Sequence, residues 1–490
     1  MPRGKDCAGV AIGHGAFMKR FAGRLLVAAA IVIFAAGQAS AQSLLRDVEI
    51  EEWLDDYSRP IFRAAGIPAD EIEILLVGDQ SFNAFAGGLV MGVNTGLLTI
   101  SETPNQIEGV IAHEAGHIAG GHTARSDEAY AAATRPMILS LVLAAGAIAA
   151  GAPDAGLGLL ALGQTVGIAN ALQYSRGQES SADQAALTYL EAVGRSGAGL
   201  IESFKKLSSS QIVHGQRVNP YLQSHPLALA RVNALEERAK QSPYFEKKDT
   251  PEEIRRLKMI QAKILGFMQP PQYTLRQFPL SDVSDPARYA RAVAYYRGTE
   301  MEKAVKEIDA LIADHPDNPF FHELKGQMLF EFGRVAESVA PHRRSVELKP
   351  GKALLRINLG RALAASEDAD NLNAAVKELK AALLLEPDNS FGWFELARAY
   401  GSLGNEPMAD LAMAESRYNV GAKPEAAQFA RRALRGLPRG TPEWRQANDI
   451  VVASLGAEAA APRGVDPAPA PERKRAPEKP RDDVPDPQFH

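Results

Sequence analysis

The pentapeptide His113-Glu114-Ala115-Gly116-His117 is the part of the sequence best suited to chemistry. Its surroundings have the apolar spacing of a helix, and residues four apart on a helix share one face. His113 and His117 could therefore bind one metal ion, whereas Glu114, one residue off that pair, could reach a metal-bound water. Because a catalytic zinc ion needs three protein ligands and an open position, the motif predicts a further ligand elsewhere in the chain.

A second pair of polar residues, Glu179 and Asp183, has the same four-residue spacing further along the chain. Their neighbours are small or apolar, which argues against a fully solvated acidic face; these neighbours are Ala182, Ala185, Ala186 and Leu187. One carboxylate of the pair could complete a metal site, and the other could accept a hydrogen bond from a ligand imidazole.

Helices and two short strands are predicted around these motifs. Apolar spacing predicts helices over residues 44–66 and 173–238, and Thr103-Pro104 is typical of a helix start. Two runs suited to strands, residues 72–77 and 89–93, are separated by a bend that contains Gly and Asn. The histidine motif is therefore expected on a helix that follows a small sheet.

The second run, Leu89-Val90-Met91-Gly92-Val93, has two interpretations. As an edge strand it would bind substrate, because an extended peptide can add to a sheet edge through backbone hydrogen bonds. This mode of binding would favour unfolded segments over folded ones. The alternative is an ordinary strand of the sheet.

The C-terminal part of the chain contains an internal repeat that begins near residue 285. Pro316 and Pro350 lie 34 residues apart, as do Gly326 and Gly360. Small residues recur at two positions of each unit: Ala292, Gly326, Gly360 and Ala397 at the first, and Ala304, Ser338, Ala374 or Ala375, and Ala409 at the second. The pattern resembles the tetratricopeptide repeat, in which paired helices cross closely and stack into a solenoid.

Both ends of the chain differ from these regions. Lys19, Arg20 and Arg24 directly precede an apolar run, which is followed by Ala39-Ser40-Ala41; this is the order of a secretory signal peptide. The predicted organisation is a signal peptide over 1–41, a metal-site domain over 42–240, a linker with one short helix over 241–284, repeats over 285–456 and a disordered Pro-rich tail over 457–490.

Composition excludes several classes of function. The formal charge is −5 and becomes −9 without residues 1–41. This negative charge gives no electrostatic support for nucleic-acid binding. The single cysteine, Cys7, lies within that leader, which excludes an intramolecular disulfide and a thiolate zinc site in the mature chain. At 490 residues and 46% hydrophobic content, the chain can bury the cores of two or three domains.

Residues 136–172 form an apolar stretch whose only charge is Asp154. Each half would be about 26 Å long as a helix, which is at the short limit for a membrane span. Three interpretations are open: a helical hairpin buried over the metal site, a hairpin that touches or dips into a membrane as a peripheral contact, and a true two-span insertion.

Several motifs occur in a specific order: Asn83-Ala84-Phe85-Ala86 before Gly96-Leu97-Leu98, HExxH at 113–117, Glu179-x-x-Ala182-Asp183, and His225-Pro226 before Arg231. This set resembles the zinc metallopeptidases of family 48. With the leader and the repeats, the chain is most similar to the periplasmic type that carries C-terminal tetratricopeptide repeats. The resemblance implies a mainly α fold, in which a gluzincin-type domain with a small β-sheet precedes an α-solenoid.

The resemblance also implies one zinc ion per chain. Glu179 would be the third ligand beside His113 and His117, and Glu114 would be the catalytic base. Asp183 would then orient a ligand histidine.

Three further residues, His122, His225 and Arg231, could support the site. His225 or Arg231 could stabilise the oxyanion. His225 could instead be a fourth ligand that holds the enzyme latent, or a cap in a turn, and Arg231 could pair with a carboxylate. His122, five residues beyond His117, lies too far round a helix to share its metal and is expected to be structural.

The predicted function is that of a periplasmic zinc endopeptidase that degrades misfolded or stalled outer-membrane and envelope proteins. Its repeats would bind client proteins or the outer-membrane assembly machinery. The alternative is a chaperone or scaffold for outer-membrane protein assembly with a largely latent peptidase site.

Overall fold

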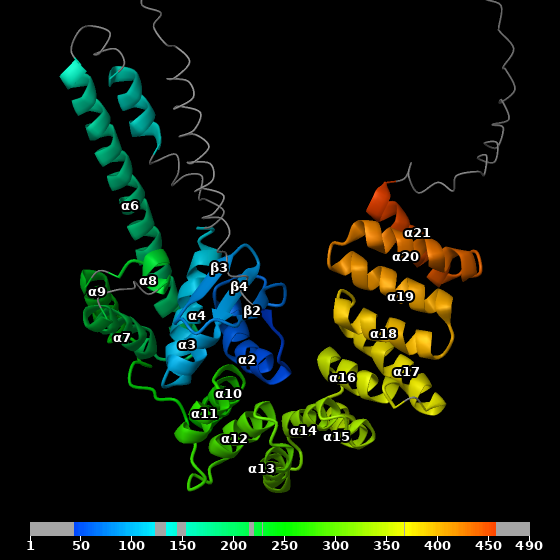
Figure 1. Ribbon diagram of the computed structural model, residues 1–490. Coiled ribbons are helices and arrows are strands. Elements are labelled where there is room, and N and C mark those ends of the chain that lie inside the picture. Colours follow the sequence, from blue (N-terminus) through cyan, green and yellow to red (C-terminus); the bar gives the residue numbers. More distant parts are fainter. Residues whose placement is uncertain are drawn as a thin grey trace, which may run out of the picture. The chain divides into compact units, whose positions relative to one another are not determined.

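The computed structural model describes residues 44–122, 134–144, 153–214, 220–227, 229–366 and 368–456. They form two compact units, the first extending to Pro316 and the second beginning at Asp317. The first unit holds a small sheet with helices around it, and the second consists of paired helices (Figure 1). The predicted fold class, mainly helical with a small sheet, is confirmed. The predicted leader and tail lie outside the described residues.

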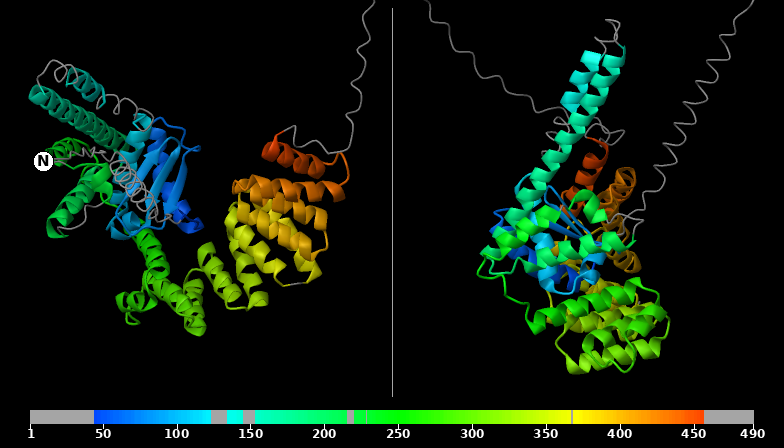
Figure 2. Two further views of the ribbon diagram at one scale, coloured as in Figure 1. Left: turned by 45° about the horizontal axis from the view of Figure 1, so that its top comes forward. Right: turned by 90° about the vertical axis from the view of Figure 1, so that its left-hand side faces the viewer.

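The sheet of the first unit has the strand order β1-β2-β4-β3. The strands are β1 (Leu44–Leu45), β2 (Glu73–Val77), β3 (Ala84–Gly87) and β4 (Val90–Asn94). Strand β4 pairs in parallel with β2 and antiparallel with β3, so it lies inside the sheet. Figure 2 shows the strands of this sheet side by side, in blue.

The prediction that residues 89–93 form an edge strand for substrate is wrong. The bend between the two predicted strands contains β3, which turns back onto β4 through Gly88 at a φ of 62°. The ring of Phe85 lies so close over Gly92 that a Cβ at residue 92 would overlap it. Both backbone edges of β4 therefore pair with neighbouring strands, and no extended substrate can add there.

Helices around the sheet carry most of the residues predicted to form the metal site. They are α2 (Val48–Ala64), α3 (Thr95–Ile100), α4 (Pro104–Ala119), α6 (Pro153–Ala192), α7 (Ala198–His214), α8 (Pro220–Ser224) and α9 (Leu229–Ala239). Helix α4 begins at Pro104, as Thr103-Pro104 predicts, and is buried from there to His117. The histidine motif therefore lies in the core of the unit.

Two glycines let the neighbouring helices approach α4 closely. A Cβ at Gly109 would lie 2.7 Å from the backbone of Leu200 in α7, and a Cβ at Gly116 would lie 2.9 Å from the backbone of Ala182 in α6. Ala182 stands between Glu179 and Asp183 in sequence. The close crossing at Gly116 thus brings the carboxylates of α6 to the histidines of α4.

Residues 241–284 differ from the linker predicted there. They contain α10 (Pro251–Met268), whose start has a complete capping box of Thr250 and Glu253, and α11 (Pro271–Gln277). Lys263 of α10 is buried and pairs with Asp47 and Glu49 at 2.7 and 3.2 Å. The charged residues that suggested a linker are one face of an amphipathic helix, because its other face is buried.

The first predicted repeat is grouped with the peptidase-side unit. Its helices, α12 (Asp285–Arg297) and α13 (Met301–Asp314), precede the division at Pro316. Tyr289 of α12 donates a hydrogen bond from its hydroxyl to Glu49 of α2 at 2.7 Å. A buried polar contact therefore joins the start of the repeats to the first unit.

The apolar stretch is exposed where the structure describes it. Residues 134–144 are helical, and with residues 153–172 of α6 they form what we call the apolar arm, which extends away from the sheet (Figure 1). Within the arm, a Cβ at Gly163 would overlap Ser140, so small residues meet there. Large apolar side chains are 50–63% exposed, including Ile138, Leu139, Leu141, Val142, Leu143, Leu157, Leu162 and Leu172. The hairpin buried over the metal site is therefore wrong for these residues. Residues 145–152 lie outside the described part.

The second unit is built from paired antiparallel helices. They are α14 (Pro319–Glu331), α15 (Val335–Leu348), α16 (Ala353–Ala364), α17 (Ala369–Leu385), α18 (Ser390–Ser402), α19 (Glu406–Asn419), α20 (Lys423–Gly436) and α21 (Pro442–Leu455). The predicted small positions are where helices cross: a Cβ at Gly360 would lie 2.6 Å from Leu379. At the second position, Ala375 is the buried residue. Among the described residues, no helix is long and apolar enough to cross a membrane.

Candidate metal centre

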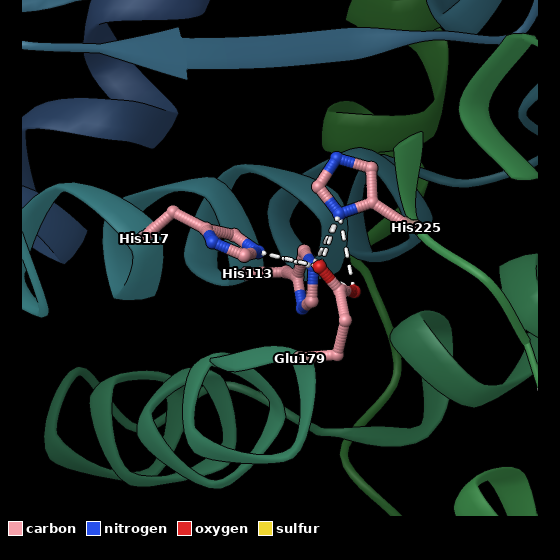
Figure 3. Close-up of side chains that lie close together, drawn as sticks. All are labelled: His113, His117, Glu179 and His225. Atoms are coloured by element: carbon pink, nitrogen blue, oxygen red, sulfur yellow. Dashed lines mark hydrogen bonds and ion pairs between the residues drawn. The ribbon is translucent and has the colours of Figure 1, made fainter. Parts of the chain in front are cut away.

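Four buried side chains converge where α4, α6 and the chain after α8 meet (Figure 3). His113 and His117 come from α4, Glu179 comes from α6, and His225 follows α8. Each offers one ligand atom, and these four atoms all lie within 4.8 Å of one another. The fold thus brings together residues that are more than a hundred positions apart in sequence.

The spacing of the ligand atoms fits a tetrahedral metal ion. Nε2 of His113 lies 3.1 Å from Nε2 of His117, and oxygens of Glu179 lie 3.5 and 3.3 Å from these two nitrogens. Ligands bound at about 2.0–2.2 Å in a tetrahedron are about 3.3 Å apart. Because the lone pairs of two facing imidazole nitrogens repel, 3.1 Å requires a proton or a cation between them. The donor set of two imidazoles and a carboxylate therefore fits a zinc-like ion.

His225 points into the same cluster. Its Nδ1 lies 3.1 Å from each oxygen of Glu179 and 3.3 Å from Nε2 of His113. Its other nitrogen, Nε2, lies 3.5 Å from Glu114, and the ring stacks on Tyr221 with centroids 4.6 Å apart. This placement favours the fourth-ligand hypothesis over a cap in a turn.

Asp183 and Arg231 support the ligands from behind. Oδ1 of Asp183 lies 2.9 Å from Nδ1 of His113. The guanidinium of Arg231 donates to both oxygens of Asp183, lies 3.0 Å from Glu179, and donates to the carbonyl of Pro226 at 3.0 Å. Arg231 thus pairs with carboxylates, which is one of the two roles considered from the sequence. Its contacts join α9 to α6.

The cluster is strongly polarised. Burial lowers the pKa of His113, but its hydrogen bonds to Asp183 and Glu179 outweigh burial and raise the pKa to about 9. Burial raises the pKa of Glu179, but hydrogen bonds from His113, His117 and His225 hold it far below its usual range. An anionic carboxylate, Glu179, therefore faces the imidazole of His113, which favours a positive charge.

Glu114 has the environment of a proton acceptor near neutral pH. Burial raises the pKa of its carboxyl to about 7, against the opposing effect of His113 and His117. The side chain is 1% exposed, and its Oε1 accepts no hydrogen bond from the described residues. A buried acceptor of this kind is suited to holding the proton of a water or a leaving group.

One residue near the cluster was not predicted to contact it. Nδ1 of His122 lies 2.9 Å from Nδ1 of His117. The prediction applied helical spacing to a residue that follows the last helical residue, Ala119. The signal that could have found the contact is Gly120-Gly121, which marks the helix end.

Comparison with known proteins first defines the class to which this geometry belongs. Residues 49–239 match Peptidase family M48, and this range contains every residue of the cluster. These residues are thus a family M48 peptidase domain, and the chain is a metalloprotease, whose class implies a bound metal.

Particular relatives extend the similarity beyond this domain. The beta-barrel assembly-enhancing protease of Escherichia coli (strain K12) is 24% identical over 388 residues, covering 76% of each chain. The protein of the same description in Yersinia pestis is 23% identical over 386 residues, again 76% of each chain. Metalloprotease YcaL of E. coli (strain K12) is 33% identical over 168 residues, or 34% of this chain and 61% of YcaL.

A solved structure, MamA MSR-1 C2, covers 34% of this chain and 95% of its own, at 18% identity and a TM-score of 0.30. The relatives described above, whose similarity covers 76% of the chain, show that it is homologous across most of its length to the beta-barrel assembly-enhancing proteases. The resemblance to family 48 is confirmed.

Proposed function

We propose that the chain is a zinc-dependent endopeptidase with one zinc ion held by His113, His117 and Glu179. The observation that carries the proposal is the convergence of their nitrogen and oxygen atoms at 3.1–3.5 Å. When bound, zinc would polarise the scissile carbonyl and acidify a water molecule. Glu114 would take the proton of that water and return it to the leaving amine.

The surrounding residues keep this arrangement in one geometry. Oδ1 of Asp183 lies 2.9 Å from Nδ1 of His113, which leaves Nε2 as the ring nitrogen that faces the ion. Arg231 neutralises Asp183 and Glu179, which would otherwise repel each other. Arg231 is thus a positioning residue in this proposal, because its guanidinium already contacts Asp183, Glu179 and the carbonyl of Pro226.

The substrates are misfolded or stalled envelope proteins, and the site of action is the periplasm. Support comes from relatives described as beta-barrel assembly-enhancing proteases, whose similarity spans the repeats as well as the peptidase domain. The repeat helices would bind client proteins or the outer-membrane assembly machinery, since stacked helical repeats present extended protein-binding surfaces.

A second candidate function is a chaperone or scaffold for outer-membrane protein assembly whose peptidase site is latent. The observation that favours it is the position of His225. Its Nδ1 lies 3.1 Å from the carboxylate of Glu179, where it would fill the open metal position that catalysis needs. Release of His225 would then be required before substrate can bind.

A casein assay separates the two functions. The wild type, Glu114→Gln and His225→Ala are compared at equal zinc content. Activity in the wild type that Glu114→Gln abolishes supports the endopeptidase. Activity that appears only in His225→Ala supports latency, and full activity in Glu114→Gln contradicts the role of that carboxylate.

The apolar arm makes a peripheral contact with a membrane in this proposal. Ile138 and Val142 are 61% and 63% exposed, and water-exposed apolar area of this kind is stabilised at a lipid surface. Vesicle co-sedimentation would compare the wild type with Leu139→Ser/Val142→Ser/Leu162→Ser. Leu384→Ser is the control, because Leu384 is 84% exposed in the other unit. Equal binding by the arm variant contradicts the contact.

A further inference from the structure

The two histidines of HExxH use their ring nitrogens in the same way. His113 and His117 direct Nε2 at each other and at Glu179, so Nδ1 of each ring points away from the proposed ion. Nδ1 of His113 has a carboxylate partner, Asp183, at 2.9 Å. Nδ1 of His117 has an imidazole partner, His122, also at 2.9 Å. Helical spacing had excluded His122 as a ligand of the metal, and the structure places it instead as a partner of the ligand His117.

A specific helix ending brings His122 back to His117. Gly121 has a φ of 62°, its N–H donates to the carbonyl of Ile118 at 3.0 Å, and the N–H of His122 donates to the carbonyl of His117 at 3.1 Å. This pair of hydrogen bonds is the Schellman motif, with glycine in the left-handed position. The chain therefore reverses at once beyond α4, and the backbone of His122 is hydrogen-bonded to the residue that its side chain contacts.

Further contacts fix the ring of His122. A Cβ at Gly120 would overlap the ring, so the glycine leaves room for it. The rings of His117 and His122 are nearly perpendicular, at 78°, with centroids 4.9 Å apart. Gln178 of α6, next to Glu179, donates to the carbonyl of His122 at 3.5 Å. Two glycines and one neighbouring helix thus hold the imidazole against His117.

We propose that His122 is a positioning residue that orients His117 toward the metal, an inference that rests on the proposed metal site. Nδ1 of His122 accepts the proton that His117 carries on its own Nδ1. That hydrogen bond leaves the lone pair of His117 on Nε2, the nitrogen that faces Glu179. His122 therefore does for His117 what Asp183 does for His113. The neutral partner supplies orientation without adding a second negative charge beside Glu179.

Metal affinity measures this role directly. The full chain would be titrated with Co²⁺ and with Zn²⁺ against a chromophoric chelator, and the absorption spectrum of the cobalt form would be recorded. His122→Ala is expected to lower metal affinity about 10–100-fold and to change the cobalt spectrum, since loss of a hydrogen-bonding partner of a ligand has effects of that size. His322→Ala, in the other unit, is the control and should match the wild type.

A conservative variant distinguishes orientation from packing. The side-chain oxygen of His122→Gln can accept the same hydrogen bond, so this variant should recover most of the affinity and the spectrum. Gly121→Ala strains the left-handed turn that brings His122 back to His117, so it should also weaken metal binding. It therefore tests the same contact in a second way if His122→Ala folds poorly.

The outcomes separate the two proposals. Wild-type affinity and spectrum in His122→Ala overturn the role of His122 and leave the metal site intact. Equal losses in His122→Ala and His122→Gln also overturn it, because they indicate packing. Failure of the wild type to bind either metal overturns the proposed function itself.

Discussion

Two histidines of this protein are both buried, but their pKa values are shifted in opposite directions. His113 of the first unit is 0% exposed, and His342 of the second is 3% exposed. For His113, burial is outweighed by hydrogen bonds to Asp183 and Glu179, which raise the pKa to about 9. For His342, burial lowers the pKa to about 4, and the charge of Arg361 acts in the same direction. The carboxylates, and not burial, therefore decide whether a buried imidazole attracts a cation.

The repeat pattern explains why His342 is buried. A Cβ at Gly326 of α14 would lie 2.7 Å from the ring of His342, and a Cβ at Gly360 of α16 would lie 2.6 Å from Leu379. His342 therefore occupies the packing position that Leu379 fills in the next repeat. One region uses a buried histidine for chemistry and the other uses it as a core side chain, so the two should respond differently to metal, charge and pH.

Removal of the metal should have the largest effect and should separate the two units. Chelation is expected to abolish proteolysis. A metal whose free concentration is a thousandfold above its Kd stabilises the unit that binds it by about 4 kcal/mol. Hydrogen exchange read by mass spectrometry should therefore show loss of protection in α4 and α6 and none in α14–α21. Equal loss in both units would contradict a metal confined to the first unit.

Breaking the ion pair between Asp183 and Arg231, behind His113, should have the next largest effect. Asp183 is 1% exposed and pairs with Arg231, so Asp183→Ala leaves a buried guanidinium without its main partner. The expected loss of stability in the first unit is about 3–5 kcal/mol. The matched control is Asp410→Ala, which breaks a pair with the half-exposed Arg432 and should cost about 0–1 kcal/mol. Similar losses for both variants in chemical denaturation would contradict this assignment.

Much of this comparison could be predicted from sequence because it depends on regular spacing. Four-residue spacing places His113 with His117 and Glu179 with Asp183, and the 34-residue period places Gly326 and Gly360 at helix crossings. These rules hold inside helices, where each residue follows the same geometry.

Other features of the molecule could not be predicted from the sequence. They depend on where a helix or strand ends, or on contacts with residues far away in the chain. His122 contacts His117 because a left-handed Gly121 reverses the chain after α4. Strand β3 is only four residues long, too short for its period to be recognised. The charges of α10 resembled a linker because the partners of its buried Lys263 lie more than two hundred residues earlier, in and before α2.

Acid should destabilise the second unit through His342. The unfolded chain takes up a proton at the ordinary histidine pKa near 6.5, whereas the folded unit resists it down to about 4. Stability should therefore fall as the pH decreases from about 6.5 to 4, by about 3 kcal/mol in total, and should not fall further from this group below pH 4. Hydrogen exchange of α14–α16 across this range would measure the loss.

The control for this pH dependence is His342→Leu, which places in α15 the residue type found at the equivalent position of α17. The variant should remove the contribution of this site and leave the metal-dependent protection of α4 unchanged. An unchanged pH slope in His342→Leu would show that other groups cause the acid sensitivity.

The smallest predicted effect is that of replacing glycine by alanine at two positions. The comparison tests whether His342 is a packing residue. At Gly326, a Cβ meets the His342 ring at 2.7 Å, whereas at Gly401 of α18 no atom lies within 4 Å. Gly326→Ala should destabilise the second unit by about 1–3 kcal/mol through overpacking. Gly401→Ala should stabilise it by up to about 1 kcal/mol, because alanine favours the helix. The double variant Gly326→Ala/His342→Ala should cost less than the sum of its single changes, since removal of the ring makes room for the new methyl group. Strictly additive losses would mean that the two residues do not share this contact, and His342 would then need another explanation than packing.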